Sequence, residues 1–208
     1  MTSNAAPRAR RSAWGAALPR SFYARDTEIV ARELLGAVLR CRTRAGTTAG
    51  RIVETEAYLG EHDLACHAAV GRTPRTDPLY GEPGTAYVYF IYGVHWCFNA
   101  VTRVPGLPSA VLVRAVEPVA GVELMRRRRG VKRDRDLTNG PGKLCQAMDI
   151  GRRHNRASLQ TSPIQILVGD PVDDDRVAIT PRIGITQCAD WPLRWVISDS
   201  DYLSKRTI

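Results

Sequence analysis

The chain has 208 residues, of which 44% are hydrophobic and 25% charged, the composition of an ordinary globular protein with one domain. No apolar run approaches the roughly 18 residues that a helix needs to span a bilayer, so we expect no membrane-spanning helix. The formal net charge of +9 favours a polyanionic partner, and nucleic acid fits better than an anionic membrane surface. Solubility alone is an alternative reason for such a charge.

Cysteine usage excludes two common structural frameworks. The five cysteines, none of them in a CxxC pair, are Cys41, Cys66, Cys97, Cys145 and Cys188. We therefore expect neither a structural zinc site nor a disulfide framework. Because His62, Cys66 and His67 match no common ligand spacing, we expect no metal there, and reduced thiols favour a cytoplasmic location.

The first 20 residues are rich in arginine and contain no acidic residue. No hydrophobic signal core follows them, which excludes a secretory leader, whereas a transit peptide stays an alternative. We expect residues 1–20 to form a flexible basic arm that follows a polyanion, and residues 21–208 to form one folded domain.

Hydrophobic patterning predicts the order of helices and strands. Asp26 and Thr27 form a capping pair, and the turns of two hairpins are predicted at AGTTAG (45–50) and at Tyr92-Gly93. The predicted elements are a helix at 26–36, strands at 37–43 and 51–58, a long loop at 59–83, strands at 85–91, 94–102 and 109–118, helices at 119–129 and 143–150, and short strands around 164–169, 177–185 and 193–198. This pattern predicts an α/β (α+β) fold, a single mixed domain around a largely antiparallel β-sheet with a protruding β-hairpin.

The strand RIVETEAY (51–58) places Glu54, Glu56 and Tyr58 on one face, with two carboxylates about 7 Å apart. Valine, threonine and alanine form the other face, which we expect to be the core side. The glutamates are then expected to face solvent or a cleft, and a solvated face is the ordinary alternative to a site. In the next apolar strand, Arg114 must reach solvent or find a carboxylate, because an unpaired buried charge is very costly.

The most aromatic stretch is the second predicted hairpin. Tyr87 and Tyr89 share one strand face, and Tyr92 stands beside Gly93 at the turn, where hairpin tips project into solvent. An exposed ring on a stiff hairpin of a basic protein is a candidate wedge into a base stack, although a turn tyrosine packed on its own hairpin is the alternative. The arginine run at 126–129 suits either a solvated helix face or phosphate neutralisation.

Six motifs in order resemble one known family. They are FYARDT (22–27), RIVETEAY (51–58), GRTPRT (71–76), YVYFIYGVHWCFN (87–99), VLVRAVEP (111–118) and NGPGKLCQA (139–147). From about residue 20 to the C-terminus the chain resembles the alkyladenine (3-methyladenine) DNA glycosylase family. That family flips damaged purines such as 3-methyladenine, 7-methylguanine, hypoxanthine and ethenoadenine out of duplex DNA and hydrolyses the N-glycosidic bond.

The resemblance also implies roles for individual residues. Glu56 matches the general base that activates water, and Arg114 matches the arginine that helps to hold that water. The expected base-binding and DNA-contacting residues are Tyr58, His67 and Tyr89 for stacking, Asn99 for disfavouring undamaged guanine, and Tyr92 for filling the gap in the duplex. Ala68, Ala69 and Thr76 depart from residues common in the family and affect loop contacts.

The resemblance further implies a monofunctional enzyme, since the family uses water rather than a lysine nucleophile. We expect no cofactor and no metal, a monomer, double-stranded DNA with damaged purines as partner, no membrane, and a cytoplasmic or nucleoid-associated location. Two alternatives stay open: a non-catalytic nucleic-acid-binding module of the same fold, and a nucleoside hydrolase. The binding module has no use for a carboxylate beside its stacking surface.

Overall fold

The computed structural model describes residues 14–205. The helices are α1 (Arg20–Tyr23), α2 (Thr27–Glu33), α3 (Val122–Arg129) and α4 (Pro141–Met148). The strands are β1 (Val38–Thr43), β2 (Gly46–Tyr58), β3 (Ala86–Ile91), β4 (His95–Val101), β5 (Ala110–Ala120), β6 (Ile164–Leu167), β7 (Val177–Thr180) and β8 (Arg194–Ile197). Short 3-10 helices, among them η1 (His67–Val70) and η2 (Asp77–Tyr80), lie in the connecting loops.

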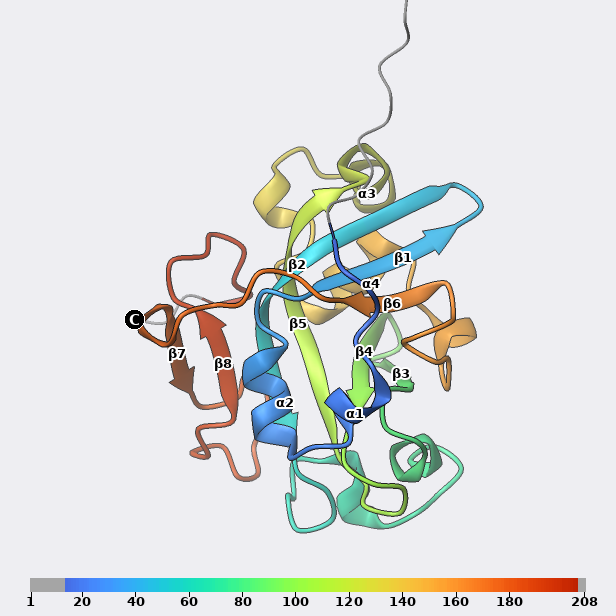
Figure 1. Cartoon of the computed structure of the whole chain (residues 1–208), viewed down its shortest axis with the longest axis vertical. Helices are drawn as coiled ribbons and strands as arrows, with labels where there is room; N and C mark the ends of the chain where they lie inside the picture. Colours follow the sequence, from blue (N-terminus) through green and yellow to red (C-terminus); the bar gives the residue numbers. More distant parts are fainter. Residues whose placement is uncertain (1–13, 206–208) are drawn as a thin grey trace, which may run out of the picture.

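The strands within this range form one eight-stranded antiparallel sheet, with the long strands β2 and β5 at its centre (Figure 1). Its order is β3-β4-β5-β2-β1-β6, and β8 joins β2 and carries β7. Strand β2 changes partner along its length: its first part pairs with β1, and its last part pairs with β8. Its register against β5 shifts on both sides of Glu54. The predicted mixed α/β domain around a largely antiparallel sheet is confirmed.

Helices cover both faces of the central strands. In Figure 1, α2 lies in front of β2 and β5 and α4 lies behind them. Helix α2 begins where the sequence predicts, because Asp26 accepts a hydrogen bond from the Glu28 N–H. Its sheet-facing side chains Val30 and Leu34 are fully buried, as is Leu144 of α4 on the other face. The main hydrophobic core therefore has two layers, one on each side of the sheet.

Two observed boundaries are informative. The segment predicted as a turn at 45–50 belongs almost wholly to β2, and only residues 44–45 connect the strands. Of the expected basic arm, residues 1–13 lie outside the described range. Residues 14–18 pack along β6, where the Gly15 N–H donates to the Val168 carbonyl at 3.0 Å.

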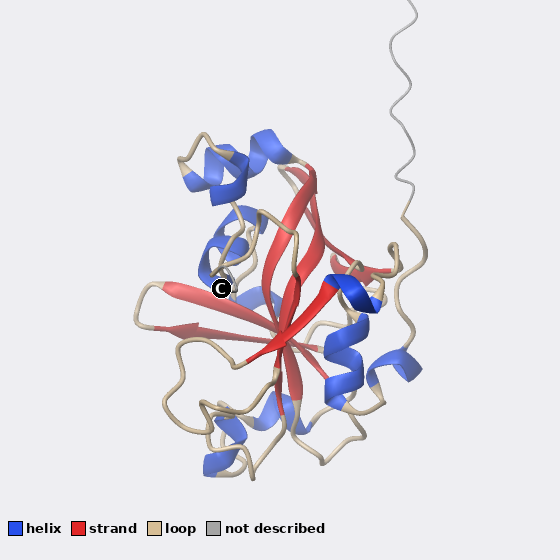
Figure 2. Cartoon of the chain, turned by 90° about the vertical axis from the view of Figure 1, so that its left-hand side faces the viewer, coloured by secondary structure: helices blue, strands red, loops and turns tan. Residues whose placement is uncertain are grey.

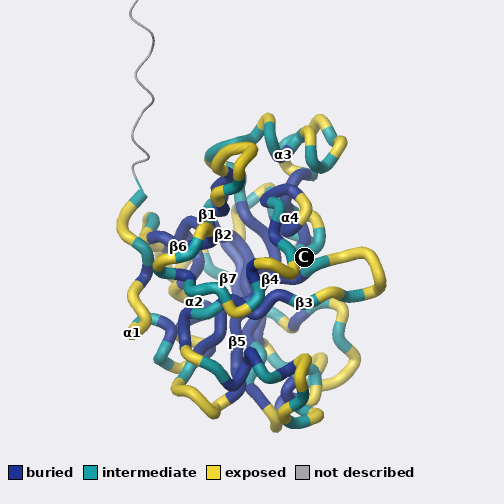
Figure 3. The backbone as a smooth tube through the Cα atoms, turned by 90° about the vertical axis from the view of Figure 1, so that its right-hand side faces the viewer, coloured by how far each residue is buried: buried dark blue, intermediate teal, exposed yellow. Residues whose placement is uncertain are grey.

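The β3–β4 hairpin protrudes from the body, as predicted. Figure 3 shows it extending away from the rest of the sheet, on the side that carries α4, and a protruding pair of strands is also visible in Figure 2. At its base Val88 and Phe98 belong to the main core. At its tip the apolar side chains of Phe90, Tyr92 and Val94 are 44%, 79% and 67% exposed. The hairpin therefore joins a rigid base to an exposed apolar end.

A buried carboxylate ties the C-terminal segment to the sheet. Glu54 is fully buried and accepts hydrogen bonds from Arg194 Nε at 2.7 Å, Arg114 Nε at 3.3 Å and the Ser204 N–H at 2.7 Å. Arg194 also donates to the Lys205 carbonyl at 2.8 Å. The expectation that this face of β2 opens to solvent or a cleft is wrong for Glu54, because β8 and the C-terminal segment cover it.

Replacing Glu54 by glutamine should lower the free energy of unfolding by about 3 kcal/mol. Glutamine keeps the shape of the side chain but leaves the buried Arg194 without its carboxylate, and breaking a buried ion pair carries a cost of that order. Urea denaturation measures the change. Glu33→Gln is the matched control, because Glu33 pairs with Arg25 at the surface and should cost less than about 1 kcal/mol. Equal small losses in both variants would contradict the assigned role of Glu54.

Candidate active site

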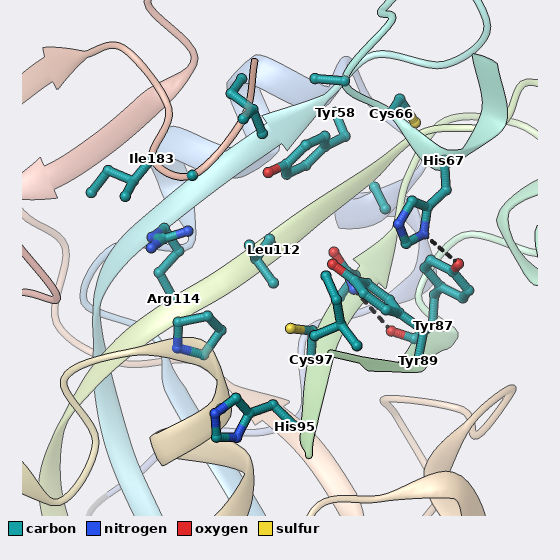
Figure 4. A pocket seen from close by; sticks show the side chains of 18 of the residues that line it. Tyr58, Cys66, His67, Tyr87, Tyr89, His95, Cys97, Leu112, Arg114 and Ile183 are labelled. Carbon is teal, nitrogen blue, oxygen red and sulfur yellow. Dashed lines mark hydrogen bonds between the residues drawn. The ribbon is translucent and has the colours of Figure 1, made fainter. Parts of the chain in front are cut away.

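A cavity of about 360 Å³ opens between the β3–β4 hairpin, the loop after β2 and the segment after β7. This volume falls within the range of about 300–1,000 Å³ that is usual for small-molecule sites. In Figure 4, the rings of His67, Tyr87 and Tyr89 gather at one side of the cavity, and Arg114 lies across from them. The cavity thus combines an aromatic wall with a charged wall.

Glu56 lies directly behind the charged wall. It is fully buried and is not among the residues that line the cavity. Its carboxylate accepts hydrogen bonds from the Ile183 N–H at 2.8 Å, Tyr58 Oη at 2.9 Å and Arg114 Nη1 at 3.2 Å. All three donors line the cavity, so Glu56 is one hydrogen bond away from it.

The electrostatics of Glu56 favour proton uptake. Burial raises the pKa of Glu56 above its ordinary value, and Arg114, the Ile183 N–H and the Tyr58 hydroxyl offset only part of this effect. The neighbouring Glu54 raises the pKa further. A carboxyl with a raised pKa is suited to accept a proton at a reacting centre.

Arg114 bridges the two buried carboxylates. Its Nη1 lies 3.2 Å from Glu56 Oε2, and its Nε lies 3.3 Å from Glu54 Oε1. The antiparallel pairing of β2 with β5 places the three side chains together, since Glu56 stands opposite Leu112. Of the two alternatives that the sequence left open for this arginine, the structure shows pairing with carboxylates.

The aromatic wall comes from the first strand of the hairpin and from η1. The ring centres of His67 and Tyr89 lie 4.4 Å apart, and those of Tyr87 and Tyr89 lie 5.3 Å apart. His67 Nδ1 and the Tyr87 hydroxyl are within hydrogen-bond distance at 2.8 Å. Tyr58 also lines the cavity, so the three predicted stacking residues, Tyr58, His67 and Tyr89, meet around it.

His67 is neutral at physiological pH. Burial and the nearby Arg75 guanidinium lower the pKa of His67 to about 4. Burial also raises the pKa of Tyr87 to about 12, so its phenol keeps its proton. The aromatic wall therefore presents neutral rings to whatever enters the cavity.

Asn99 lies on the cavity wall with a fixed orientation. It is 4% exposed and sits opposite Tyr87 in the β3–β4 ladder. Its Nδ2 donates to the Tyr87 carbonyl at 3.1 Å, which fixes which end of the amide faces the backbone. A fixed amide can reject a ligand whose polar edge does not match it.

Tyr92 stands at the tip of the hairpin and is 79% exposed, although it also contacts the mouth of the cavity. Its φ of 54° lies in the left-handed region, as does that of Gly93 at 69°. Such backbone conformations are typical of tight hairpin turns. The alternative of a turn tyrosine packed on its hairpin does not fit this exposure.

Local sequence patterns do not predict two further features of the site, the ion pair of Arg182 with Asp63 and the hydrogen bond between His67 and Tyr87. Arg182 and Asp63 form a buried ion pair, and the backbone N–H of the next residue, Ile183, contacts Glu56. Tyr87 was assigned to the same strand face as Tyr89 but was not predicted as a site residue. Its hydrogen bond with His67 joins two segments about 20 residues apart, a contact that no local pattern encodes.

Residues 14–205 contain neither a metal-binding cluster nor a membrane-spanning helix. Within that range no group of three histidine, cysteine or acidic side chains could hold a metal ion. The same range contains no helix long and apolar enough to cross a membrane. What the cavity offers is a set of neutral stacking surfaces beside a buried, arginine-paired carboxylate.

Comparison with known proteins confirms the resemblance. A family model described as methylpurine-DNA glycosylase (MPG) matches residues 21–201. Similar proteins, each named "Putative 3-methyladenine DNA glycosylase", come from Myxococcus xanthus (50% identical, covering 90% of this chain and 93% of that protein), Carboxydothermus hydrogenoformans (45%, 91% and 99%) and Salinibacter ruber (48%, 90% and 96%). The chain belongs to the methylpurine-DNA glycosylase family.

Proposed function

We propose that this protein binds a damaged purine nucleotide flipped out of duplex DNA and hydrolyses its N-glycosidic bond with a water molecule that Glu56 activates. The observation that carries the proposal is the buried carboxylate one hydrogen bond behind an aromatic cavity. A stacking surface alone would serve binding, whereas the added carboxylate and arginine serve bond cleavage.

The described residues fill three acceptor positions of the Glu56 carboxylate. A carboxylate offers about four acceptor positions, and three are taken by Arg114, Tyr58 and Ile183. We place the O–H of the attacking water at the fourth position, between the carboxylate and the anomeric carbon. Arg114 then keeps the carboxylate from being neutralised before the water arrives, and Glu56 takes the proton as the bond breaks.

One carboxylate is sufficient for such a reaction when the leaving group is a good one. An alkylated purine is cationic and leaves as a neutral base, so no second carboxylate of the kind used by sugar glycosidases is needed. A neutral lesion such as hypoxanthine needs protonation of its ring. No lysine lines the cavity among the described residues, which fits a monofunctional enzyme that uses water as nucleophile.

The aromatic wall explains how the extruded base is held. Extrusion from the duplex costs a few kcal/mol, least for a damaged or mispaired base. Stacking recovers roughly 1–3 kcal/mol per base and tolerates different ring structures. We propose that Tyr58, His67 and Tyr89 supply the stacking, that Asn99 disfavours undamaged guanine, and that Tyr92 fills the gap left in the duplex.

We further propose that the enzyme acts as a monomer on damaged duplex DNA in the cytoplasm or at the nucleoid. The exposed Tyr92 and the formal charge of +9 support a duplex substrate over a free nucleoside, which needs neither a wedge nor phosphate contacts. Release of hypoxanthine from free deoxyinosine as fast as from duplex DNA would instead support a nucleoside hydrolase.

Changing Glu56 to glutamine should lower base release by about 10²–10⁴-fold while leaving binding intact, because it removes the general base and keeps the shape of the side chain. Single-turnover release of hypoxanthine and of 7-methylguanine from duplex DNA, without added metal, measures the loss. Gel-shift titration with the same duplexes measures binding. Tight binding without base release in the wild type would make the protein a nucleic-acid-binding module.

The pH dependence of base release should show the raised pKa of Glu56. The carboxylate is the active form, so the rate falls as pH drops through this pKa, and the fall should be centred above the ordinary value of 4.5. The single-turnover rate on 7-methylguanine, followed between pH 4 and 9 and corrected for spontaneous depurination, gives the midpoint. A midpoint at or below 4.5 would contradict Glu56 as a buried general base.

Replacing Tyr92 by asparagine should weaken base release from a paired lesion by about one to two orders of magnitude. Asparagine tolerates the left-handed backbone, so the change removes the ring without straining the turn, and one lost stacking contact is worth roughly 1–3 kcal/mol. The loss should be small on the same lesion in single-stranded DNA, where no gap needs filling. Val94→Ala, at an exposed neighbouring position, is the control and should leave both rates unchanged.

A further inference from the structure

A second buried ion pair lies beside the cavity, and no role in the proposed reaction has been assigned to it. Both side chains of Arg182 and Asp63 are fully buried. Arg182 Nη1 donates to Asp63 Oδ2 at 2.5 Å and Nη2 donates to Oδ1 at 2.8 Å. This bidentate (two-pronged) contact fixes the orientation of the guanidinium group as well as its distance from the carboxylate. The pair joins segments separated by 119 residues.

Each partner is anchored to further backbone. Arg182 Nη1 also donates to the Ala57 carbonyl of β2 at 3.0 Å. Asp63 accepts the backbone N–H groups of Leu59 and Ala65, both at 3.1 Å. The pair therefore fastens the segment after β7 to the last residues of β2 and to the loop that leads to His67.

The same guanidinium supports the cavity wall. The Cζ atom of Arg182 lies 4.8 Å from the centre of the Tyr58 ring, so the ring is held between the guanidinium and the cavity. The residue that follows Arg182 donates its backbone N–H to Glu56 Oε1 at 2.8 Å. Because the two residues are consecutive, a fixed Arg182 also fixes the position of the Ile183 N–H.

We propose that Asp63 and Arg182 form a positioning pair for the reaction at Glu56: they hold the Ile183 N–H on the carboxylate and the Tyr58 ring beside it. The chemical part of this inference rests on the proposed glycosylase function. A buried ion pair adds little stability relative to apolar residues of the same size. What the charged pair provides here is a fixed direction for two groups that contact Glu56 or the base.

The consequence for Glu56 follows from hydrogen bonding. An N–H that donates to a carboxylate favours its charged form, so loss of the Ile183 contact should raise the pKa of Glu56 further. The charged or titratable groups that face Glu56 are Glu54 and Tyr58 of β2, Cys97 of β4, Arg114 of β5 and Arg182 itself. Of these, Glu54, Cys97 and Arg114 should stay in place when Arg182 is replaced.

The test is Arg182→Lys, which keeps the positive charge but loses the two-pronged contact. The titration midpoint of the Glu56 carboxyl, followed by carbon-13 NMR and assigned with Glu56→Gln, should move up by about one pH unit. The acid limb of base release should move with it, giving about tenfold slower release on the limb and a near wild-type plateau at higher pH. Arg176→Lys, which alters an exposed pair with Asp199, is the matched control and should move neither midpoint.

A second variant covers the case in which lysine does not fold at this position. Asp63→Asn combined with Arg182→Gln removes both charges together and should give the same upward shift. The proposal is overturned by a folded variant with a wild-type Glu56 midpoint, by a rate loss equal at every pH, or by failure of both variants to fold, which would make the pair a folding element only. Absence of base release in the wild type, with the NMR shift still present in Arg182→Lys, would reject the glycosylase function and keep the positioning role.

Discussion

The burial of two carboxylates, two residues apart on the central strand, constrains the rest of this structure. Charges taken out of water must be matched by opposite charges and hydrogen-bond donors, or the strand cannot pack. Glu54 receives two guanidinium groups and the Ser204 segment. Glu56 shares one of those guanidinium groups and otherwise receives a hydroxyl and a backbone N–H. Glu54 is thus compensated by two positive charges, whereas Glu56 is compensated by one.

Meeting this constraint requires chain segments from distant parts of the sequence. Strand β5 brings Arg114, strand β8 brings Arg194, and the segment after β7 brings the Ile183 N–H. Strand β5 and the segment after β7 also line the cavity, and β8 covers the face of β2 beside Glu54. The segments that compensate the carboxylates are therefore in part the same segments that form the cavity.

Sequence patterns predicted the local elements, but not the contacts that join them. The capping pair at Asp26, the aromatic hairpin and the strand with paired glutamates each follow a local period, and each was found where it was expected. No periodic pattern in the sequence predicts the contact between Asp63 and Arg182, because the pair connects two irregular segments. For the same reason the sequence predicted that Glu54 faces solvent or a cleft. Alternation along a strand shows which residues lie on the same face, but not which distant segment covers that face.

The contacts of the arginine run of α3 likewise could not be predicted from the sequence. The sequence left open whether it forms a solvated face or neutralises phosphates. In the structure Arg126 pairs with Asp134, while Arg128 and Arg129 donate to the carbonyls of Ala147 and Leu137. These guanidinium groups fasten α3 to the segments that surround α4.

In the proposed reaction, recognition of an extruded base rests on unequal contributions from stacking and from polar contacts. The neutral rings of His67, Tyr87 and Tyr89 attract any flat base with little preference, whereas the fixed amide of Asn99 offers one of the few directional contacts. A cavity built in this way cannot separate many lesions by shape alone. Discrimination between damaged and normal purines must therefore come largely from two energies outside the cavity wall: the cost of extruding each base from its stack, and the ease with which each base leaves the sugar. Both favour a weakly stacked, positively charged base, so a broad pocket and a selective reaction are compatible.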